Sequence, residues 1–97
     1  MKENKSEKKR PVVPLGRLLV EADVPAQLRA AGVTVDELVR RHQAGDWGMV
    51  DEFEQEHLDW SAAHGKPVTS TFVIWIEGKA RTVFITTEEK MTYVVLI

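Results

Sequence analysis

The last thirty residues constrain the fold more than any other part of this chain. Residues 68–97 contain three runs rich in β-branched and aromatic residues, separated by two short polar segments at residues 77–80 and 88–90. Two polar breaks between three such runs are typical of an antiparallel β-meander. Because a small sheet needs a covered apolar face to be stable in water, we expect helices from the preceding part of the chain to pack on it.

The residues of each predicted strand alternate between the two faces of the sheet. In the first strand, Phe72 and Ile74 share one face, whereas Val73 and Trp75 share the other. Neither face is consistently polar across the three strands. We therefore expect one face to be fully covered and the other to be only partly exposed to water.

The final run ends on four apolar residues, Val94-Val95-Leu96-Ile97. An apolar strand at the edge of a sheet invites pairing with another chain. This run is therefore either a central strand, which we favour, or an edge strand covered by a partner, as in a homodimer through the C-terminal strand.

Length and composition exclude several classes of protein. The chain has 97 residues, 43% of them hydrophobic, and no apolar run near the roughly 20 residues that span a membrane. It has no cysteine, which excludes disulfides, thiol catalysis and thiolate zinc sites. We expect a cytoplasmic protein, since the first residues also lack the apolar core of a secretory signal.

Charge is distributed unevenly along the chain. Residues 1–10 contain five Lys or Arg and two Glu, a net charge of +3, whereas residues 11–97 contain eight Lys or Arg and thirteen Asp or Glu, a net charge of −5. We expect residues 1–10 to be a disordered basic tail, either solubilising or an arm for nucleic acid, and residues 11–97 to form a single domain. The acidic domain suits a partner protein with a basic surface, and direct nucleic-acid binding is not expected.

The segments before the meander carry helix signals. Residues 15–20 predict a short strand or the first turn of a helix, and residues 23–32 a short helix with Asp23 as its N-cap. Thr34 and Glu37 form the pattern of a capping box. The helix that follows ends before Gly45, and it carries one apolar stripe made of Val35, Leu38, Val39 and His42.

A third helix is predicted from residue 49 or 50 to residue 64. The 3, 4, 3, 4 spacing places five of its larger side chains on one face: Val50, Phe53, His57, Trp60 and His64. The remaining surface is predicted to be an exposed negative ridge, formed by Asp51, Glu52, Glu54, Glu56 and Asp59.

The segment Gly45-Asp46-Trp47-Gly48 predicts a tight turn before this helix. Two interpretations of Trp47 stay open. The indole either folds back on the core as a corner lock, which we favour, or is exposed as an anchor for a partner.

The sequence gives little support for a catalytic, metal-binding or base-stacking site. His57 and His64 lie two helical turns apart, about 10 Å, which is too far for one metal ion, so neither a metal nor a cofactor is expected. Ser61 and His64 share a helix without an evident oxyanion hole. The sheet aromatics offer either a base-stacking platform or, as we favour, core packing: Phe72, Trp75, Phe84 and Tyr93.

The segment HQAGDWG at residues 42–48, followed by an acidic helix and by residues 85–96, resembles a family of short uncharacterised bacterial proteins found on plasmids, integrative elements and phage-like regions. The likeness covers residues 15–97, and GDWG is its one specific motif. This chain departs from the pattern by an additional Thr in residues 85–88 and by Lys90-Met91, where a basic and a small residue are usual. The resemblance implies a mobile-element context and no particular chemistry.

The expected order of elements also resembles the RelE-type ribonuclease toxins, which are generally basic. Such a toxin, or another toxin–antitoxin component, is the alternative function, and it would depend on a basic residue such as Arg81. The acidic charge of this domain and the lack of an arginine-rich final strand argue against it.

These observations predict an α+β domain, in which a short N-terminal strand or turn and two to three helices pack on one face of a C-terminal three-stranded antiparallel meander. The leading hypothesis is a non-enzymatic protein-interaction module, an acidic inhibitor or modulator of a host nuclease or defence complex of the anti-CRISPR or anti-restriction type. The predicted partner-binding residues are Trp47, Asp51, Glu52, Glu54, Glu56 and Asp59.

Overall fold

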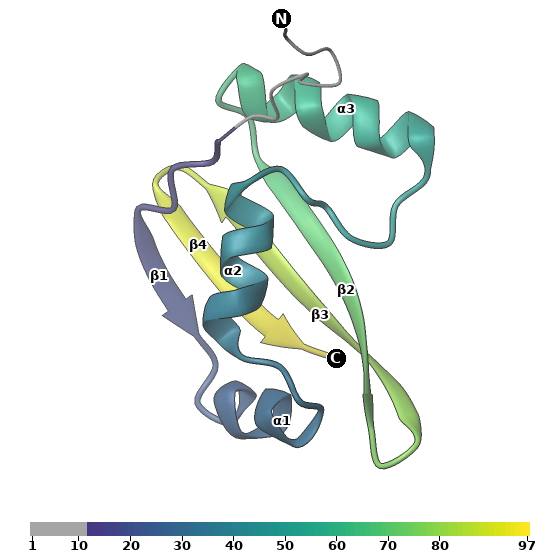
Figure 1. Cartoon of the computed structure of the whole chain (residues 1–97). Coiled ribbons are helices and arrows are strands. Elements are labelled where there is room, and N and C mark those ends of the chain that lie inside the picture. Colours follow the sequence, from purple (N-terminus) through teal and green to yellow (C-terminus); the bar gives the residue numbers. More distant parts are fainter. Residues whose placement is uncertain (1–11) are drawn as a thin grey trace, which may run out of the picture.

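A computed structural model describes residues 12–97 of the chain, and the predicted tail at residues 1–10 lies outside them. The described residues form four strands and three helices (Figure 1). In chain order, these are β1 (Arg17–Val20), α1 (Val24–Ala30), α2 (Val35–Gln43), α3 (Glu52–Ala63), β2 (Val68–Ile76), β3 (Lys79–Glu88) and β4 (Met91–Leu96). The predicted α+β fold is confirmed, and residues 15–20 supply a strand.

The four strands form one mixed sheet in the order β1-β4-β3-β2. The meander of β2, β3 and β4 is antiparallel, whereas β1 runs parallel to β4, with Leu19 opposite Tyr93. The C-terminal run is therefore a central strand, as favoured from the sequence. The two edges of the sheet are β1 and β2.

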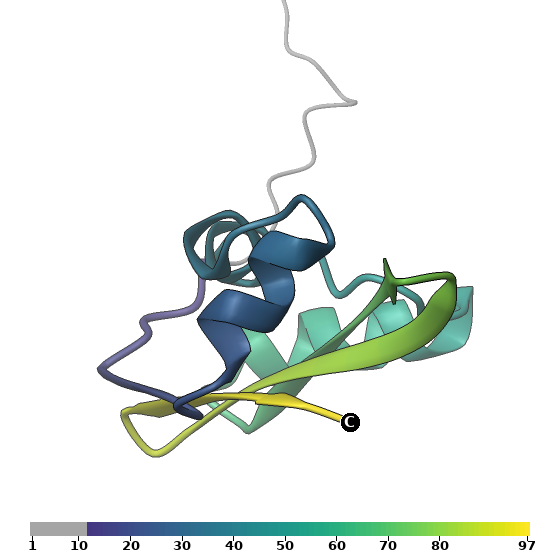
Figure 2. The same ribbon diagram turned by 90° about the horizontal axis from the view of Figure 1, so that it is seen from below.

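Helices α1 and α2 lie on the same side of the sheet, and most of the core is formed there (Figures 1 and 2). The buried cluster contains Val24, Leu28, Leu38 and Val39 from the helices and Phe72, Ile74, Val83, Ile85 and Val94 from the strands. On the opposite face, Val73 is 40% exposed, Trp75 63% and Tyr93 36%. The predicted contrast between a covered face and a partly exposed face is confirmed.

The sheet aromatics do not form one surface. Phe72 is buried under the helices, whereas Trp75 and Tyr93 point to the opposite face. A platform of all four aromatic residues is therefore wrong, because Phe72 lies on the opposite face from Trp75, Phe84 and Tyr93. The core role favoured for these residues is confirmed for Phe72 and is wrong for Trp75, which is 63% exposed.

The ends of α1 and α2 follow their sequence signals with one exception. The Thr34 hydroxyl accepts a hydrogen bond from the Glu37 backbone N–H at 3.1 Å, and the Glu37 carboxylate accepts one from the Thr34 N–H at 3.4 Å. This capping box is confirmed. Asp23 occupies the N-cap position of α1 but makes no side-chain capping bond, since its backbone is already helical.

Helix α3 lies at one end of the sheet and packs a different face from the one expected. Of the five-residue stripe, Phe53 is 79% exposed and Trp60 51% exposed, and both histidines are exposed too. The side of α3 that faces the rest of the protein carries Leu58, Ser61 and Ala62. The large indole of Trp47 already fills the space beneath this helix, so only smaller side chains fit against it.

Candidate functional site

The acidic residues predicted for α3 divide into two groups in the structure. Four of them are exposed and lie within six residues at the start of the helix, and we refer to them as the acidic ridge: Asp51, Glu52, Glu54 and Glu56. The Asp51 carboxylate also accepts a hydrogen bond from the Glu54 backbone N–H at 2.8 Å, which caps the helix. Residues 42–65 contain six acidic residues and no Lys or Arg, and one of the six, Asp46, pairs with Arg41 just before this segment.

Asp59 does not belong to the exposed group. Its carboxylate accepts a hydrogen bond from the Trp47 Nε1–H at 2.8 Å, and its side chain is half-buried. Trp47 itself is 1% exposed and packs against Val13 and Val68. This burial fits the corner-lock interpretation of Trp47, and in the folded protein its indole is not available to a partner.

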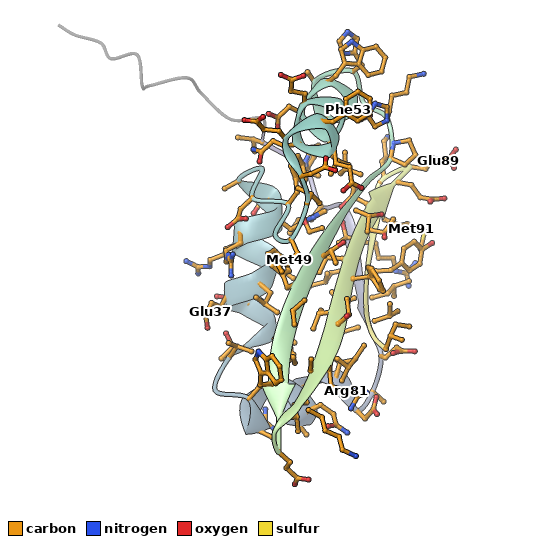
Figure 3. All side chains as sticks on the ribbon, turned by 90° about the vertical axis from the view of Figure 1, so that its right-hand side faces the viewer. Glu37, Met49, Phe53, Arg81, Glu89 and Met91 are labelled. Atoms are coloured by element: carbon orange, nitrogen blue, oxygen red, sulfur yellow. The ribbon has the colours of Figure 1, made fainter. Side chains whose placement is uncertain are left out.

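Two aromatic side chains on the outer side of α3 are exposed and could serve as the partner anchor that the buried Trp47 cannot provide. Phe53, labelled in Figure 3, and Trp60 are two helical turns apart and both exposed. The Trp60 ring stacks on the His64 imidazole, with 4.1 Å between ring centroids and 18° between planes. We refer to Phe53, Trp60 and His64 as the aromatic patch. Stacking on His64 favours this orientation of the Trp60 indole at the surface.

The exposure of the aromatic patch was missed at the sequence level, although a signal for it exists. The spacing of Leu58, Ser61 and Ala62 defines a second, smaller stripe on the same helix. This stripe combines one aliphatic side chain, Leu58, with two small ones and so fits close packing, whereas the patch stripe contains two histidines, which are less often fully buried than aliphatic residues. The turn residue Trp47 decides between the two stripes.

The chain also contains a fully buried histidine, His42, which joins two strands of the sheet. Its Nδ1 lies 2.7 Å from the Ser70 hydroxyl on β2, and its Nε2 lies 2.9 Å from the Thr87 hydroxyl on β3. The chain of contacts continues from Thr87 to Thr92 at 2.7 Å and from the Thr92 hydroxyl to the Leu15 carbonyl at 2.7 Å. We refer to this set as the His42 network.

A count of protons assigns the direction of each bond in the His42 network. A neutral imidazole and three hydroxyls supply four protons, and the network contains four contacts of 2.9 Å or less. Because Thr92 donates to the Leu15 carbonyl, Thr87 donates to Thr92, and the His42 Nε2–H donates to Thr87. Ser70 then donates its single proton to Nδ1, which at 2.7 Å is a closer acceptor than the Asp46 carbonyl at 3.3 Å.

This arrangement gives His42 a structural role. Burial lowers the pKa of the imidazole to about 4, because the charged form loses its hydration in the core. Both ring nitrogens are occupied, and the side chain is 0% exposed, so no substrate can reach it. The predicted proximity of Ser61 and His64 also leads to no dyad: Ser61 is 4% exposed, whereas the His64 Nδ1 bonds to the Trp60 carbonyl at 2.8 Å.

The GDWG turn holds the end of α2, the start of α3 and strand β2 together. The Asp46 carboxylate pairs with the Arg41 guanidinium at 2.7 Å and accepts a hydrogen bond from the Gly48 N–H at 3.1 Å. Gly48 has a φ of +79°, and a side chain there would bring Cβ within 2.1 Å of the Thr71 carbonyl oxygen. Residue 48 must therefore be glycine for the turn to reach the edge of the sheet.

The part of the chain that the structure describes contains neither a metal-binding cluster nor a membrane-spanning helix. Within residues 12–97, no group of three His, Asp or Glu side chains could hold a metal ion. None of the helices in the same range is long and apolar enough to cross a membrane.

Comparison of the chain with known protein families, with curated proteins and with solved structures finds no match. The resemblance to the mobile-element family with the GDWG motif therefore stays a prediction.

Proposed function

We propose that this protein is a non-enzymatic interaction module that binds a basic partner protein through the outer side of α3. The observation that carries this proposal is the exposure of Phe53 and Trp60 on the helix that also carries the four exposed carboxylates of the acidic ridge. Removing the exposed area of an aromatic ring from water is favourable, so a partner that covers these rings would gain binding free energy.

The two parts of this surface would contribute differently to binding. Trp60 is prepositioned by its stacking on His64, and tryptophan is among the residues that contribute most to binding when a partner buries it. The acidic ridge raises the rate of encounter with a positively charged surface and adds less to the affinity itself. The aromatic patch would therefore set the lifetime of the complex, and the acidic ridge its rate of formation.

The class of partner follows from the charge and from the expected mobile-element context. Proteins that bind nucleic acid carry the basic surfaces that neutralise phosphates. An acidic, aromatic-bearing surface can occupy such a site and block it. The proposed partner is a host nuclease or defence complex, and the effect is inhibition or modulation of the anti-CRISPR or anti-restriction type.

The experiment uses affinity capture from the native host and then kinetics with the purified partner. A ridge variant combines Glu52→Lys, Glu54→Lys and Glu56→Lys, and a patch variant combines Phe53→Ser with Trp60→Ser. We expect the ridge variant to associate with the partner more slowly, and its association rate should no longer depend on salt in the way that the native rate does. The patch variant should dissociate from the partner faster. The matched control is Glu88→Lys with Glu89→Lys, two exposed acids at the β3–β4 turn.

Equal binding of the ridge variant, the patch variant and the control would reject this surface as the site. The ribonuclease-toxin alternative makes the opposite prediction for the chain alone: growth arrest on expression and cleaved transcripts, both lost with Arg81→Ala. In the structure, the Arg81 Nε–H donates to the Ile97 carbonyl at 3.0 Å. The stability of that variant must therefore be measured alongside its toxicity.

A further inference from the structure

Strand β2 forms an edge of the sheet that is only partly covered. The Thr71 N–H donates to the Trp47 carbonyl at 2.9 Å, and the Met49 N–H donates to the Thr71 carbonyl at 2.7 Å, with Gly48 opposite Thr71 in a parallel bridge. The chain then turns away, because the Val50 N–H bonds back to the Gly48 carbonyl at 2.9 Å. The GDWG turn thus adds a short piece of strand beside β2 and stops at Met49.

Beyond Met49, the backbone of β2 offers hydrogen-bonding groups to the outside. In an antiparallel pair, alternate residues direct both backbone groups toward the same neighbour, and Thr71 directs its groups outward. Val73 and Trp75 therefore direct theirs outward as well. Among residues 12–97, no strand or turn pairs with these two residues. Residues 73–76 are a short template for one more strand.

A groove accompanies this open edge on the side of α2. Its lining includes Val33, Leu38 and Met49 next to the edge residues, and Met49 is 69% exposed. The Arg41 guanidinium also lines the groove, held 4.6 Å above the Phe72 ring and paired with Asp46. A strand added beside residues 73–76 would direct every second side chain toward these aliphatic groups.

We propose that residues 73–76 of β2 bind an extended peptide segment of a partner protein by β-strand addition. The peptide would have aliphatic side chains at alternate positions and no proline where its N–H faces β2, since each such N–H bonds to a β2 carbonyl. This surface belongs to a different element from α3, and the proposal does not depend on the α3 surface.

The length of the open edge favours a peptide over a second copy of this chain. Four residues extend about 13 Å at 3.3 Å per residue. A stable dimer buries about 800 Å² on each partner, more than four edge residues supply. Residue 77 also begins the tight turn to β3, so a second β2 strand would end within the interface.

The test measures peptide binding to the whole protein by amide NMR. The probe is acetyl-Ser-Thr-Val-Thr-Val-Thr-Ser-amide, and the control peptide has the same sequence with every backbone amide N-methylated. With free probe at about nine times its Kd, the Val73 and Trp75 amides should exchange with water about tenfold more slowly, whereas the Phe72 and Ile74 amides should already be protected by β3 in the free protein.

Two variants separate strand addition from other contacts. Val73→Pro removes the outward N–H at a position where an edge strand tolerates proline, and it should weaken probe binding at least several-fold. Val73→Thr keeps the N–H and should bind as the native protein does. The proposal would be overturned if the N-methylated peptide bound, if both variants bound the probe equally, or if Val73 and Trp75 gained no protection at millimolar probe. It would also be overturned if the probe perturbed α3 alone, or if the protein dimerised through β2 as its concentration was raised.

Discussion

Acidification should destabilise this protein through His42 before most carboxylates titrate. In the unfolded chain, the imidazole has its ordinary pKa of 6.5, whereas burial lowers it to about 4 in the folded protein. Between these values, the unfolded state binds more protons than the folded state. The free energy of unfolding therefore keeps its full value above about pH 6.5 and falls as the pH is lowered toward 4.

The size of this effect follows from the shift. The pKa falls from 6.5 to about 4, and each unit corresponds to about 1.4 kcal/mol, so the loss approaches about 3 kcal/mol. A domain of this size is stable by roughly 5–15 kcal/mol in total. A single imidazole would thus control a large share of the stability at mildly acidic pH.

Urea unfolding followed by circular dichroism between about pH 7 and pH 4.5 measures this loss directly. His42→Gln keeps a donor and an acceptor without a titrating ring, so its free energy of unfolding should depend less on pH than that of the native protein. His57→Gln, an exposed position on α3, serves as the matched control and should keep the native pH dependence. Identical curves for the native protein and His42→Gln would refute the neutral buried imidazole.

The remaining predictions concern the GDWG turn and the α3 surface. Gly48→Ala should lower the free energy of unfolding in urea by more than about 2 kcal/mol, because it adds the clash with Thr71 to backbone strain. Gly65→Ala, at φ +68° in open space, should lower it by about 1 kcal/mol, and equal losses for the two variants would contradict the clash at residue 48. Trp47→Phe should lose about 1–3 kcal/mol through the missing bond to Asp59 and a partial cavity, and unchanged stability would argue against a corner lock. Trp60→Ala should change stability by less than about 0.5 kcal/mol while it weakens partner binding, and the opposite result would place Trp60 in the core.

The parts of the fold that depend on local sequence were predicted correctly. Runs of β-branched and aromatic residues between polar breaks identified the three strands of the meander, although they did not say which face of the sheet is buried. The capping box at Thr34 identified the start of α2, because both partners of its hydrogen bonds lie within four residues. Local patterns of this kind need no knowledge of the rest of the chain.

The orientation of α3 and the His42 network depend on contacts between distant residues. The stripe through Phe53 and Trp60 has a regular helical spacing, but helical spacing alone does not say which stripe meets the core. His42 bonds to Ser70 and Thr87, which lie 28 and 45 positions further along the chain. No spacing in the sequence relates these residues, since the sheet register brings them together.

The parallel pairing of β1 with β4 also determines when the protein can become complete during synthesis. Arg17 lies opposite Met91, so the second residue of this pair leaves the ribosome long after the first. Until β4 emerges, Leu18 and Leu19 have no strand to pair with, and β3 has a bare edge. Such distant pairing slows folding, so the nascent chain passes through a period in which chaperones, or premature association with other chains, compete for its apolar strands.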